Sequence, residues 1–291
     1  MSALTQAIET CITEITGTAF AVAGQQNLGG GCINEASCLT GKDGRSFFIK
    51  QNTQQMLPAF EAEAHALDAM LKTETIRVPA PVGTCHADGQ AALVLEYLAM
   101  GNGRSGNWET MGRQLARMHR HVAENHGWPH DNWIGSSPQI NTPGPDGVRF
   151  LAECRLGPQV EWARKRGLAL RNAEALMERL PDLHGDYVPQ PSLLHGDLWA
   201  GNAGFLDDGT PVIFDPAAYY GDREADIAMT EMFGGYSPAF YDGYNAEWPL
   251  DSGYRIRKQL HLLYHTLNHY NLFGGGYGSQ AEALIASLLR S

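Results

Sequence analysis

The segment 193–228 carries carboxylate and amide side chains at a spacing that suits phosphoryl transfer. Asp197 and Asn202 stand in a D-x-x-x-x-N pattern, and Asp215 follows a short apolar run. Moving a phosphoryl group from ATP to a hydroxyl needs a carboxylate that orients the hydroxyl and takes its proton, together with hard oxygen ligands for Mg²⁺. We therefore predict that Asp197 is the general base and that Asn202 and Asp215 are the Mg²⁺ ligands.

A second His-Gly-Asp triplet at 184–186 competes with the triplet that contains Asp197. Asp186, however, has Pro191 where the asparagine is required, and no apolar run with a later aspartate follows at the right distance. The triplet, the asparagine and the later aspartate of 193–228 all agree with the catalytic-loop template of protein kinases. This agreement disfavours the alternative interpretation of 193–228 as a surface loop rich in turn residues.

Two further residues of this segment are predicted to support the catalytic loop. Asp226 is expected to accept hydrogen bonds from the backbone of the loop, with Asp222 and Glu224 as alternatives on the same stretch. His195 belongs to the His-Gly-Asp triplet and is expected to have a structural role.

The first third of the chain offers a cover and a lysine for the phosphates of ATP. Gly29, Gly30 and Gly31 lie between β-like runs and are followed by Cys32, and glycine lets backbone N–H groups approach phosphates closely. The alternative is an ordinary hairpin turn. Lys50 ends the predicted strand "FFIK". In protein kinases a lysine at this position on a strand holds the α and β phosphates of ATP.

A carboxylate on the following helix should pair with Lys50. Glu63 and Glu61 both lie on the expected helix 59–71. Glu63 is favoured because an apolar stripe runs beside it, whereas Glu61 lies on a different face.

The end of the β-rich region should form a hinge that binds adenine. Backbone groups of Glu96, Tyr97 and Leu98 are predicted to hydrogen-bond the base. The chain then divides into a nucleotide-binding lobe, 1–98, and a catalytic and acceptor-binding lobe, 99–291.

Hydrophobic periodicity predicts an α+β protein with two lobes, a small β-rich one followed by a larger helical one. Strands are expected within 19–51, as in "SFFIKQN" (46–52), and on both sides of an Asp88–Gly89 turn. The segment 193–215 is expected to form a loop and two short strands. Helices are expected over 3–16, 59–71, 107–122, 148–166, 168–180, 222–233, 253–272 and 277–290.

The composition is that of an ordinary globular protein. Of 291 residues, 43% are hydrophobic and 18% charged, with a formal net charge of −11. The acidic balance makes nucleic acid and anionic membranes poor partners. The five cysteines show no CxxC spacing, which disfavours a disulfide framework. The sequence also shows no basic and apolar leader and no long apolar stretch, so a reducing cytoplasm is the expected location.

Several strings resemble the fructosamine-3-kinase (ketosamine-3-kinase) family, which is related to aminoglycoside phosphotransferases. They are "GGGCIN", "FFIK", "HGDLWAGN", "FDPAAYYGDREADIAMTEMFGG" and "LLYHTLNHYNLFGGGY", and the resemblance extends from about residue 20 to 290. It implies a protein-kinase-like fold, ATP and Mg²⁺ as cofactors, and phosphorylation of the sugar O3′ of ketosamines, free or bound to protein. The 3-phosphate decomposes and frees the amine, so the implied role is deglycation and repair.

The acceptor side is predicted from aromatic and amide residues. Trp199 follows the proposed base and could stack on a sugar ring, or could pack beneath the loop. Asn132 and Trp133 lie in 127–141, which is too polar and too rich in proline and glycine for regular structure, and they are candidates for the acceptor pocket.

Three histidines recur every four residues on one predicted helix, namely His261, His265 and His269. A metal site is disfavoured because the glutamate of H-E-x-x-H is missing and no fourth ligand is evident. A polar wall of the acceptor cleft and satisfied core histidines are the favoured alternatives.

Cys32 could also be a redox switch. Backbone N–H groups that attract phosphate would favour the reactive thiolate, which could form a disulfide with a small thiol or with Cys32 of a second chain. The alternative is a small packing residue, although Cys38 is the better candidate for a buried cysteine. A monomer and a homodimer both remain open.

The competing functions are a phosphotransferase of the aminoglycoside or choline type and a nucleotide-binding scaffold without activity. Both are disfavoured, the first by the tryptophan of "HGDLW" and the "FGGGY" string, the second by the complete set of catalytic residues.

Overall fold

The computed structural model describes residues 2–29, 34–101 and 106–291, and the chain divides into two compact units. The first comprises Met1–Asn107 and Gly204–Pro216, and the second comprises Trp108–Ala203 and Ala217–Ser291. This division differs from the single predicted boundary after residue 98, because a later segment joins the first unit. Helices and sheet are mixed, as the α+β prediction expects.

The first unit is built on an antiparallel sheet whose strands run in the order β1-β2-β3-β5-β4. The strands are β1 (Val22–Leu28), β2 (Glu35–Gly41), β3 (Ser46–Thr53), β4 (Pro81–Ala87) and β5 (Gln90–Glu96). The β4–β5 turn is formed by Asp88 and Gly89, both at positive φ, so the predicted hairpin is confirmed.

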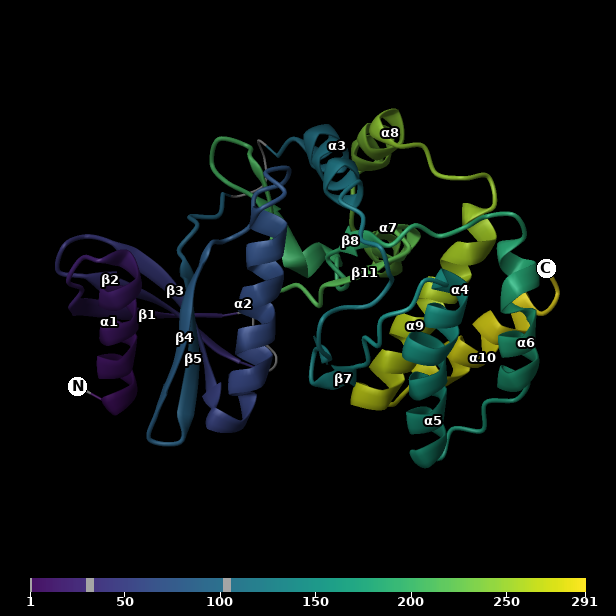
Figure 1. Cartoon of the computed structure of the whole chain (residues 1–291), viewed down its shortest axis with the longest axis horizontal. Coiled ribbons are helices and arrows are strands. Elements are labelled where there is room, and N and C mark those ends of the chain that lie inside the picture. The colour runs from purple at the N-terminus through teal and green to yellow at the C-terminus, as the bar shows by residue number, and fades with distance from the viewer. Residues whose placement is uncertain (1, 30–33, 102–105) are drawn as a thin grey trace. The chain divides into compact units, whose positions relative to one another are not determined.

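Two helices, α1 (Ala3–Thr16) and α2 (Leu57–Leu71), flank this sheet, and a 3₁₀ turn, η1 (Gln54–Met56), precedes α2 (Figure 1). Ile49 belongs to the apolar cluster that contains Leu4 and Ile8 of α1. Successive strand residues point to opposite faces, so Lys50 faces away from α1. The predicted helices and the strand "SFFIKQN" are therefore confirmed, and the lysine is directed toward α2.

The later segment joins the first unit through backbone hydrogen bonds. It contains β9 (Ala203–Phe205) and β10 (Pro211–Ile213), which pair with each other. Ile213 donates its N–H to the carbonyl of Arg77 (3.0 Å), and Gly101 donates to the carbonyl of Phe205 (2.8 Å). These bonds hold the chain just before Asp215 within the same compact unit as Lys50.

The second unit is mainly helical. Its helices are α3 (Trp108–His119), α4 (Gly147–Phe150), α5 (Gly157–Lys165), α6 (Ala173–His184), α7 (Glu224–Met232), α8 (Pro238–Glu247), α9 (Tyr254–Phe273) and α10 (Tyr277–Leu288). A π-helical turn, η2 (Leu151–Leu156), joins α4 to α5, which explains the single predicted helix 148–166. The helix α8 was not predicted from the sequence.

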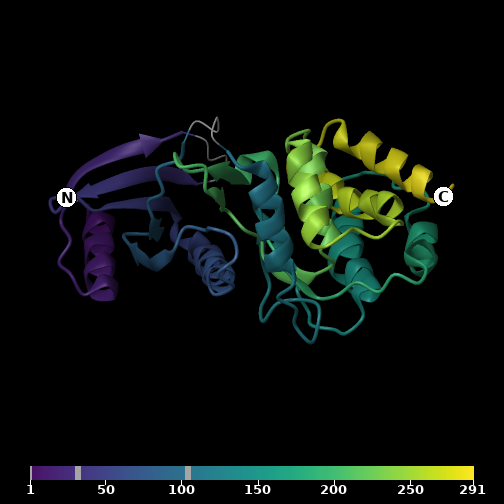
Figure 2. The same ribbon diagram turned by 90° about the horizontal axis from the view of Figure 1, so that it is seen from above.

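The core of the second unit gathers around α9. Leu260, Leu263 and Leu267 of this helix lie in one buried cluster with apolar residues of α5, α6 and α10. Figure 2 shows α9 and α10 close together at the C-terminal end of the chain. Leu260 and Leu267 are fully buried, so α9 is a rigid support for any polar side chain on its other faces.

Four short strands complete the second unit: β6 (Asn132–Ile134), β7 (Ser137–Gln139), β8 (Ser192–Leu194) and β11 (Tyr219–Gly221). The β6–β7 hairpin shows that the prediction of no regular structure in 127–141 was wrong. β8 pairs with β11 in antiparallel register, Leu194 opposite Tyr219. The strand β8 also bonds to the backbone of His121 and Val122, so the His-Gly-Asp loop and its 3₁₀ turn, η3 (Ala200–Asn202), begin from an anchored strand.

No helix among the described residues is long and apolar enough to cross a membrane.

Candidate active site

In the first unit, Lys50 forms a buried ion pair with α2. Its Nζ lies 2.6 Å from Oε1 of Glu63, and the lysine side chain is 8% exposed. Glu61 is exposed on another face of the helix. The structure therefore pairs Lys50 with the glutamate that the apolar stripe favoured.

Asp215 forms a second ion pair with Lys50. Its backbone is in the left-handed region, at φ 60°, which is uncommon for a residue other than glycine. Such strain is found preferentially at functional sites. A phosphate could thus replace a carboxylate as partner of the Lys50 ammonium group, and a metal ion could replace the ammonium group as partner of Asp215.

The predicted hinge has its one carboxylate already engaged. Glu96 pairs with Arg77 and accepts a hydrogen bond from the backbone N–H of Ala80 at 3.1 Å. Tyr97 is exposed and Leu98 is half-buried. Adenine recognition through the backbone at Glu96, Tyr97 and Leu98 stays a prediction.

The glycine segment is described only in part. Gly29 is exposed, with open space where a Cβ would lie. Gly30, Gly31 and Cys32 lie outside the described residues, so the phosphate cover and the redox switch stay predictions. Cys38 is buried, as expected.

In the second unit, Asp197 and Asn202 are joined as the D-x-x-x-x-N pattern predicts. Asn202 Nδ2 donates to the backbone carbonyl of Asp197 at 2.9 Å and to its carboxylate Oδ2 at 3.2 Å. Burial raises the pKa of Asp197 to about 7, although the bond from Asn202 opposes this shift. A carboxyl group with a pKa near neutrality is well matched to proton transfer.

Asp226, on α7, accepts hydrogen bonds from the backbone of the His-Gly-Asp loop. Its Oδ2 accepts the N–H of His195 at 2.7 Å, and its Oδ1 accepts the N–H of Gly196 at 2.8 Å. These are the contacts expected of the supporting carboxylate. His195 is fully buried, and its Nδ1 accepts the N–H of Asp197 at 3.3 Å.

Gly196 is required by the fold of this loop. Its φ is +83°, and a Cβ there would lie 2.1 Å from the carbonyl oxygen of Ala217. Only glycine fits both conditions. Any other residue would displace the backbone beside Asp197.

His119 is a further support of the loop that was not predicted from the sequence. It is fully buried on α3, where Nε2 lies 3.1 Å from Asp226 and Nδ1 lies 2.8 Å from the hydroxyl of Tyr244. A buried histidine on an amphipathic helix gives no sequence signal of its partner 107 residues away.

Trp199 lies on the surface of the loop. Its indole packs against Gly201, and 39% of the residue is exposed. Its ring centroid lies 6.1 Å from that of Phe233. An exposed aromatic face beside the proposed base agrees better with substrate stacking than with packing beneath the loop.

Asn132 and Trp133 differ in their surroundings. Asn132 is buried, donates to the carbonyl of Ala218 at 2.8 Å and accepts from the side chains of Gln139 and Asn141. These contacts favour a structural role for Asn132 over a substrate contact. Trp133 is half-buried, and its role stays a prediction.

The three histidines of α9 do not form a metal cluster among the described residues. The one candidate group there combines His261 with Asp222 and Glu224. Both carboxylate oxygens of Glu224 accept hydrogen bonds from Arg257 at 2.8 Å, so this group is an ion-pair network. Burial lowers the pKa of His265 to about 3, as expected of a core histidine.

The rejected triplet lies at the end of α6. Asp186 is exposed in the turn that follows this helix. That Asp186 takes no part in catalysis stays a prediction.

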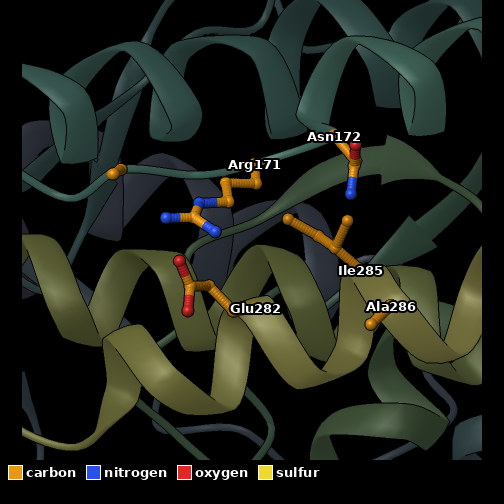
Figure 3. Close-up of a pocket in the computed structure, with 6 residues that line it drawn as sticks. Arg171, Asn172, Glu282, Ile285 and Ala286 are labelled. Carbon is orange, nitrogen blue, oxygen red and sulfur yellow. The ribbon is translucent and has the colours of Figure 1, made fainter.

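A cavity of about 430 Å³ lies between residues 169–172 and α10, also in the second unit. Figure 3 shows Arg171 and Glu282 with their charged groups facing each other across it. None of the predicted site residues lines this cavity, so it is separate from the catalytic loop.

Comparisons with known proteins identify the family of this chain. The family model described as fructosamine kinase matches residues 4–291. The Synechocystis protein named Probable ketoamine kinase is 44% identical, over 98% of this chain and 97% of its own. The chloroplastic protein-ribulosamine 3-kinase of Arabidopsis thaliana is 42% identical, over 91% of this chain and 82% of its own.

Solved structures give the fold. A Haemophilus somnus protein described as a putative fructosamine-3-kinase is 30% identical, with a TM-score of 0.90 over 98% of this chain and 97% of its own. The choline kinase of Streptococcus pneumoniae, 13% identical with a TM-score of 0.61 over the whole of both chains, shares the fold alone. The protein-kinase-like fold is thereby confirmed. This chain belongs to the fructosamine kinase family.

Proposed function

We propose that this protein is an ATP-dependent kinase that phosphorylates the sugar O3′ of ketosamines, such as ribulosamine and fructosamine adducts. The observation that carries the proposal is the setting of Asp197. Asn202 donates a hydrogen bond to its carboxyl group, and Asp226 accepts one from the backbone of the preceding Gly196. Burial brings the pKa of Asp197 near neutrality. Relatives named for ketoamine and ribulosamine kinase activity support the acceptor class.

Asp197 acts on the acceptor hydroxyl. In its deprotonated form the carboxylate accepts a hydrogen bond from the sugar hydroxyl. It would take the proton as the oxygen bonds to the γ-phosphorus of ATP, the bond from that phosphorus to the bridging oxygen breaks, and ADP leaves. The hydrogen bond from Asn202 Nδ2 keeps the carboxylate oriented toward the acceptor. Positioned general bases contribute about 10²- to 10⁴-fold in rate.

Lys50 acts on the nucleotide. Its ammonium group, fixed by Glu63, is assigned to the α and β phosphates of ATP. The release of Asp215 from Lys50 on nucleotide binding would make that carboxylate available to a cation.

The donor set fits Mg²⁺. Asn202 turns its amide nitrogen toward Asp197, so the amide oxygen is its atom for a metal. Asp215 offers a carboxylate whose side chain is 46% exposed. Both are the hard oxygen ligands that Mg²⁺ prefers, and the bound ion would neutralise charge on the transferred phosphoryl group.

The acceptor sugar is assigned to the exposed face of Trp199. His269 of α9 adds a polar group nearby through Phe233, whose ring centroid lies 5.3 Å from the His269 ring. This assignment uses one of the two alternatives for the α9 histidines, the polar wall of the acceptor site.

The proposal is tested by ATP turnover with a panel of acceptors. Ribulosamine and fructosamine adducts, free and on a lysine peptide, are compared with choline and an aminoglycoside. We expect turnover with the ketosamines alone, and its loss in Asp197→Ala with nucleotide binding retained. Turnover only with choline or the aminoglycoside would overturn the acceptor assignment.

The proposal also includes redox control through Cys32 and a cytoplasmic location. It leaves both a monomer and a homodimer open. Cys32→Ala and wild type are compared after mild oxidation, with and without reductant. Reversible loss in wild type alone supports the switch, and equal behaviour of both proteins contradicts it.

A further inference from the structure

The second unit presents two exposed aromatic rings, one of them beside the catalytic loop, that the reaction chemistry alone does not require. Phe233 is 45% exposed and Phe273 is 65% exposed. Both rings contact His269, with centroid separations of 5.3 Å and 5.8 Å. We call Phe233, His269 and Phe273 the aromatic cluster. Such exposed rings cost free energy in water unless a ligand covers them.

The cluster continues directly from the catalytic loop. The ring of Phe233 lies 6.1 Å from that of Trp199, which follows Asp197 in the same loop. In a ketosamine the amine nitrogen is bonded to C1, roughly 5 Å or less from O3′ by ordinary bond lengths. A sugar placed on Trp199 with its O3′ at Asp197 therefore has its amine close to the cluster.

Two helices end at the two phenylalanines. Phe233 directly follows the last residue of α7, and Phe273 is the last residue of α9. The carbonyl ends of helices carry a partial negative charge that favours cations. The faces of aromatic rings attract cations as well. Both effects act at the same place because one histidine ring contacts both phenylalanines.

His269 adds a hydrogen-bond acceptor between the rings. Its Nδ1 lies 2.8 Å from the backbone carbonyl of His265, which can only accept, so Nδ1 carries the proton. Burial lowers the pKa of His269, so the ring is neutral at neutral pH. Its Nε2 then offers a lone pair to a donor such as an N–H of an ammonium group.

We propose that Phe233 and Phe273, with His269 between them, form an ammonium subsite that binds the protonated secondary amine of the substrate. The subsite selects sugars that carry an amine on C1 over the corresponding free or ether-linked ketoses. It rests on the proposed function for its substrate, while its preference for an alkylammonium group over a neutral isostere follows from the cluster itself.

The kinetic test uses two matched acceptors. One is an N-butyl 1-amino-1-deoxyribulose, and the other is the 1-O-butyl ether, in which oxygen replaces the ammonium nitrogen. Phe233→Leu and Phe273→Leu remove the ring faces but keep apolar bulk. Val188→Ala, a substitution of an exposed residue on the loop after α6, is the control.

Each leucine variant should lower kcat/KM for the amine acceptor about five- to thirty-fold, mainly because KM rises. The kcat/KM for the ether acceptor should change less than about twofold. The control should leave both acceptors unchanged, and melting temperatures should confirm that the variants fold. Equal losses for both acceptors, or no loss for the amine, would overturn the subsite.

A binding test separates this proposal from the proposed function. Ligand-observed NMR compares butyl(methyl)ammonium with butyl methyl ether on the intact wild type and on both leucine variants. Selective ammonium binding that weakens in the variants supports the subsite even if no ketosamine is phosphorylated. Equal binding of the two probes, or binding of neither, overturns it even if the kinase activity is found.

Discussion

Asn202 Nδ2 donates to Asp197 Oδ2 at 3.2 Å, across the loop that carries both residues. The bond orients the one carboxylate of the loop and directs the asparagine oxygen elsewhere. A single interaction therefore serves the proposed base and the proposed metal ligand. It also opposes the rise in the Asp197 pKa that burial causes.

The raised pKa of Asp197 should cost stability. An aspartate has a pKa of about 3.9 in the unfolded chain and here about 7 in the folded one, so the folded state binds the proton more tightly. Stability is then greatest below the unfolded pKa and is lost as pH rises through the folded pKa. Asp197→Asn should raise the melting temperature of the nucleotide-free protein, more at about pH 8 than at about pH 5. An equal shift at both values, or a lower melting temperature at pH 8, would contradict the raised pKa.

The pairing of Lys50 with Glu63 predicts a difference between two glutamates of one helix. Glu63→Gln removes the carboxylate that fixes the lysine. Because a hydrogen bond to a charged group contributes about 1.5 kcal/mol, we expect KM for ATP to rise about tenfold. Glu61→Gln changes an exposed residue two positions away and should leave KM unchanged. Steady-state kinetics with varied ATP measures both. The reverse pattern would mean that the lysine partner is misassigned.

The exposed triplet at 184–186 predicts a silent substitution. Asp186→Asn should keep kcat within about twofold of wild type, because an exposed surface carboxylate away from the site has small effects. A large drop in kcat at an unchanged melting temperature would show that the chemistry uses this aspartate.

The buried ion pair between Glu224 and Arg257 predicts a large stability effect. The two side chains are 0% and 2% exposed. Among the described residues, Glu224→Gln leaves Asp251 as the remaining ion-pair partner of a buried guanidinium, and breaking such pairs costs about 3 kcal/mol. Denaturant unfolding measures the loss.

The matched control is the exposed pair of Glu161 and Lys165 in the same unit, 2.6 Å apart. Glu161→Gln should leave the unfolding midpoint unchanged, because exposed pairs contribute little. Similar effects of the two substitutions would contradict the burial argument.

Much of the candidate active site could be predicted because its parts are local in sequence. Asp197 and Asn202 belong to one loop, and the position of Glu63 follows from helical periodicity over a few residues. The β4–β5 turn was equally clear, since Asp88 and Gly89 tolerate positive φ.

Long-range relationships gave no such signal. The contact of Phe233 with His269 joins the end of α7 to α9, and the four-residue spacing that singles out His269 gives no indication of Phe233. The bond between Gly101 and Phe205 assigns 204–216 to the first unit, which no local pattern indicates. The helix α8 was missed because its sequence, "PAFYDGYNAE", contains glycine, aspartate and asparagine and few strong helix formers.

The most direct test of the account is to locate the phosphate in the product. A ribulosamine adduct is incubated with ATP and Mg²⁺ and with wild type or Asp197→Asn, and phosphorus–proton correlation NMR assigns the phosphorylated oxygen. We predict phosphate on O3′ with wild type and a rate at least about 10²-fold lower with the variant. Phosphate on another oxygen, or equal rates for the two proteins, would contradict the assignment of Asp197 as the base of a ketosamine 3-kinase.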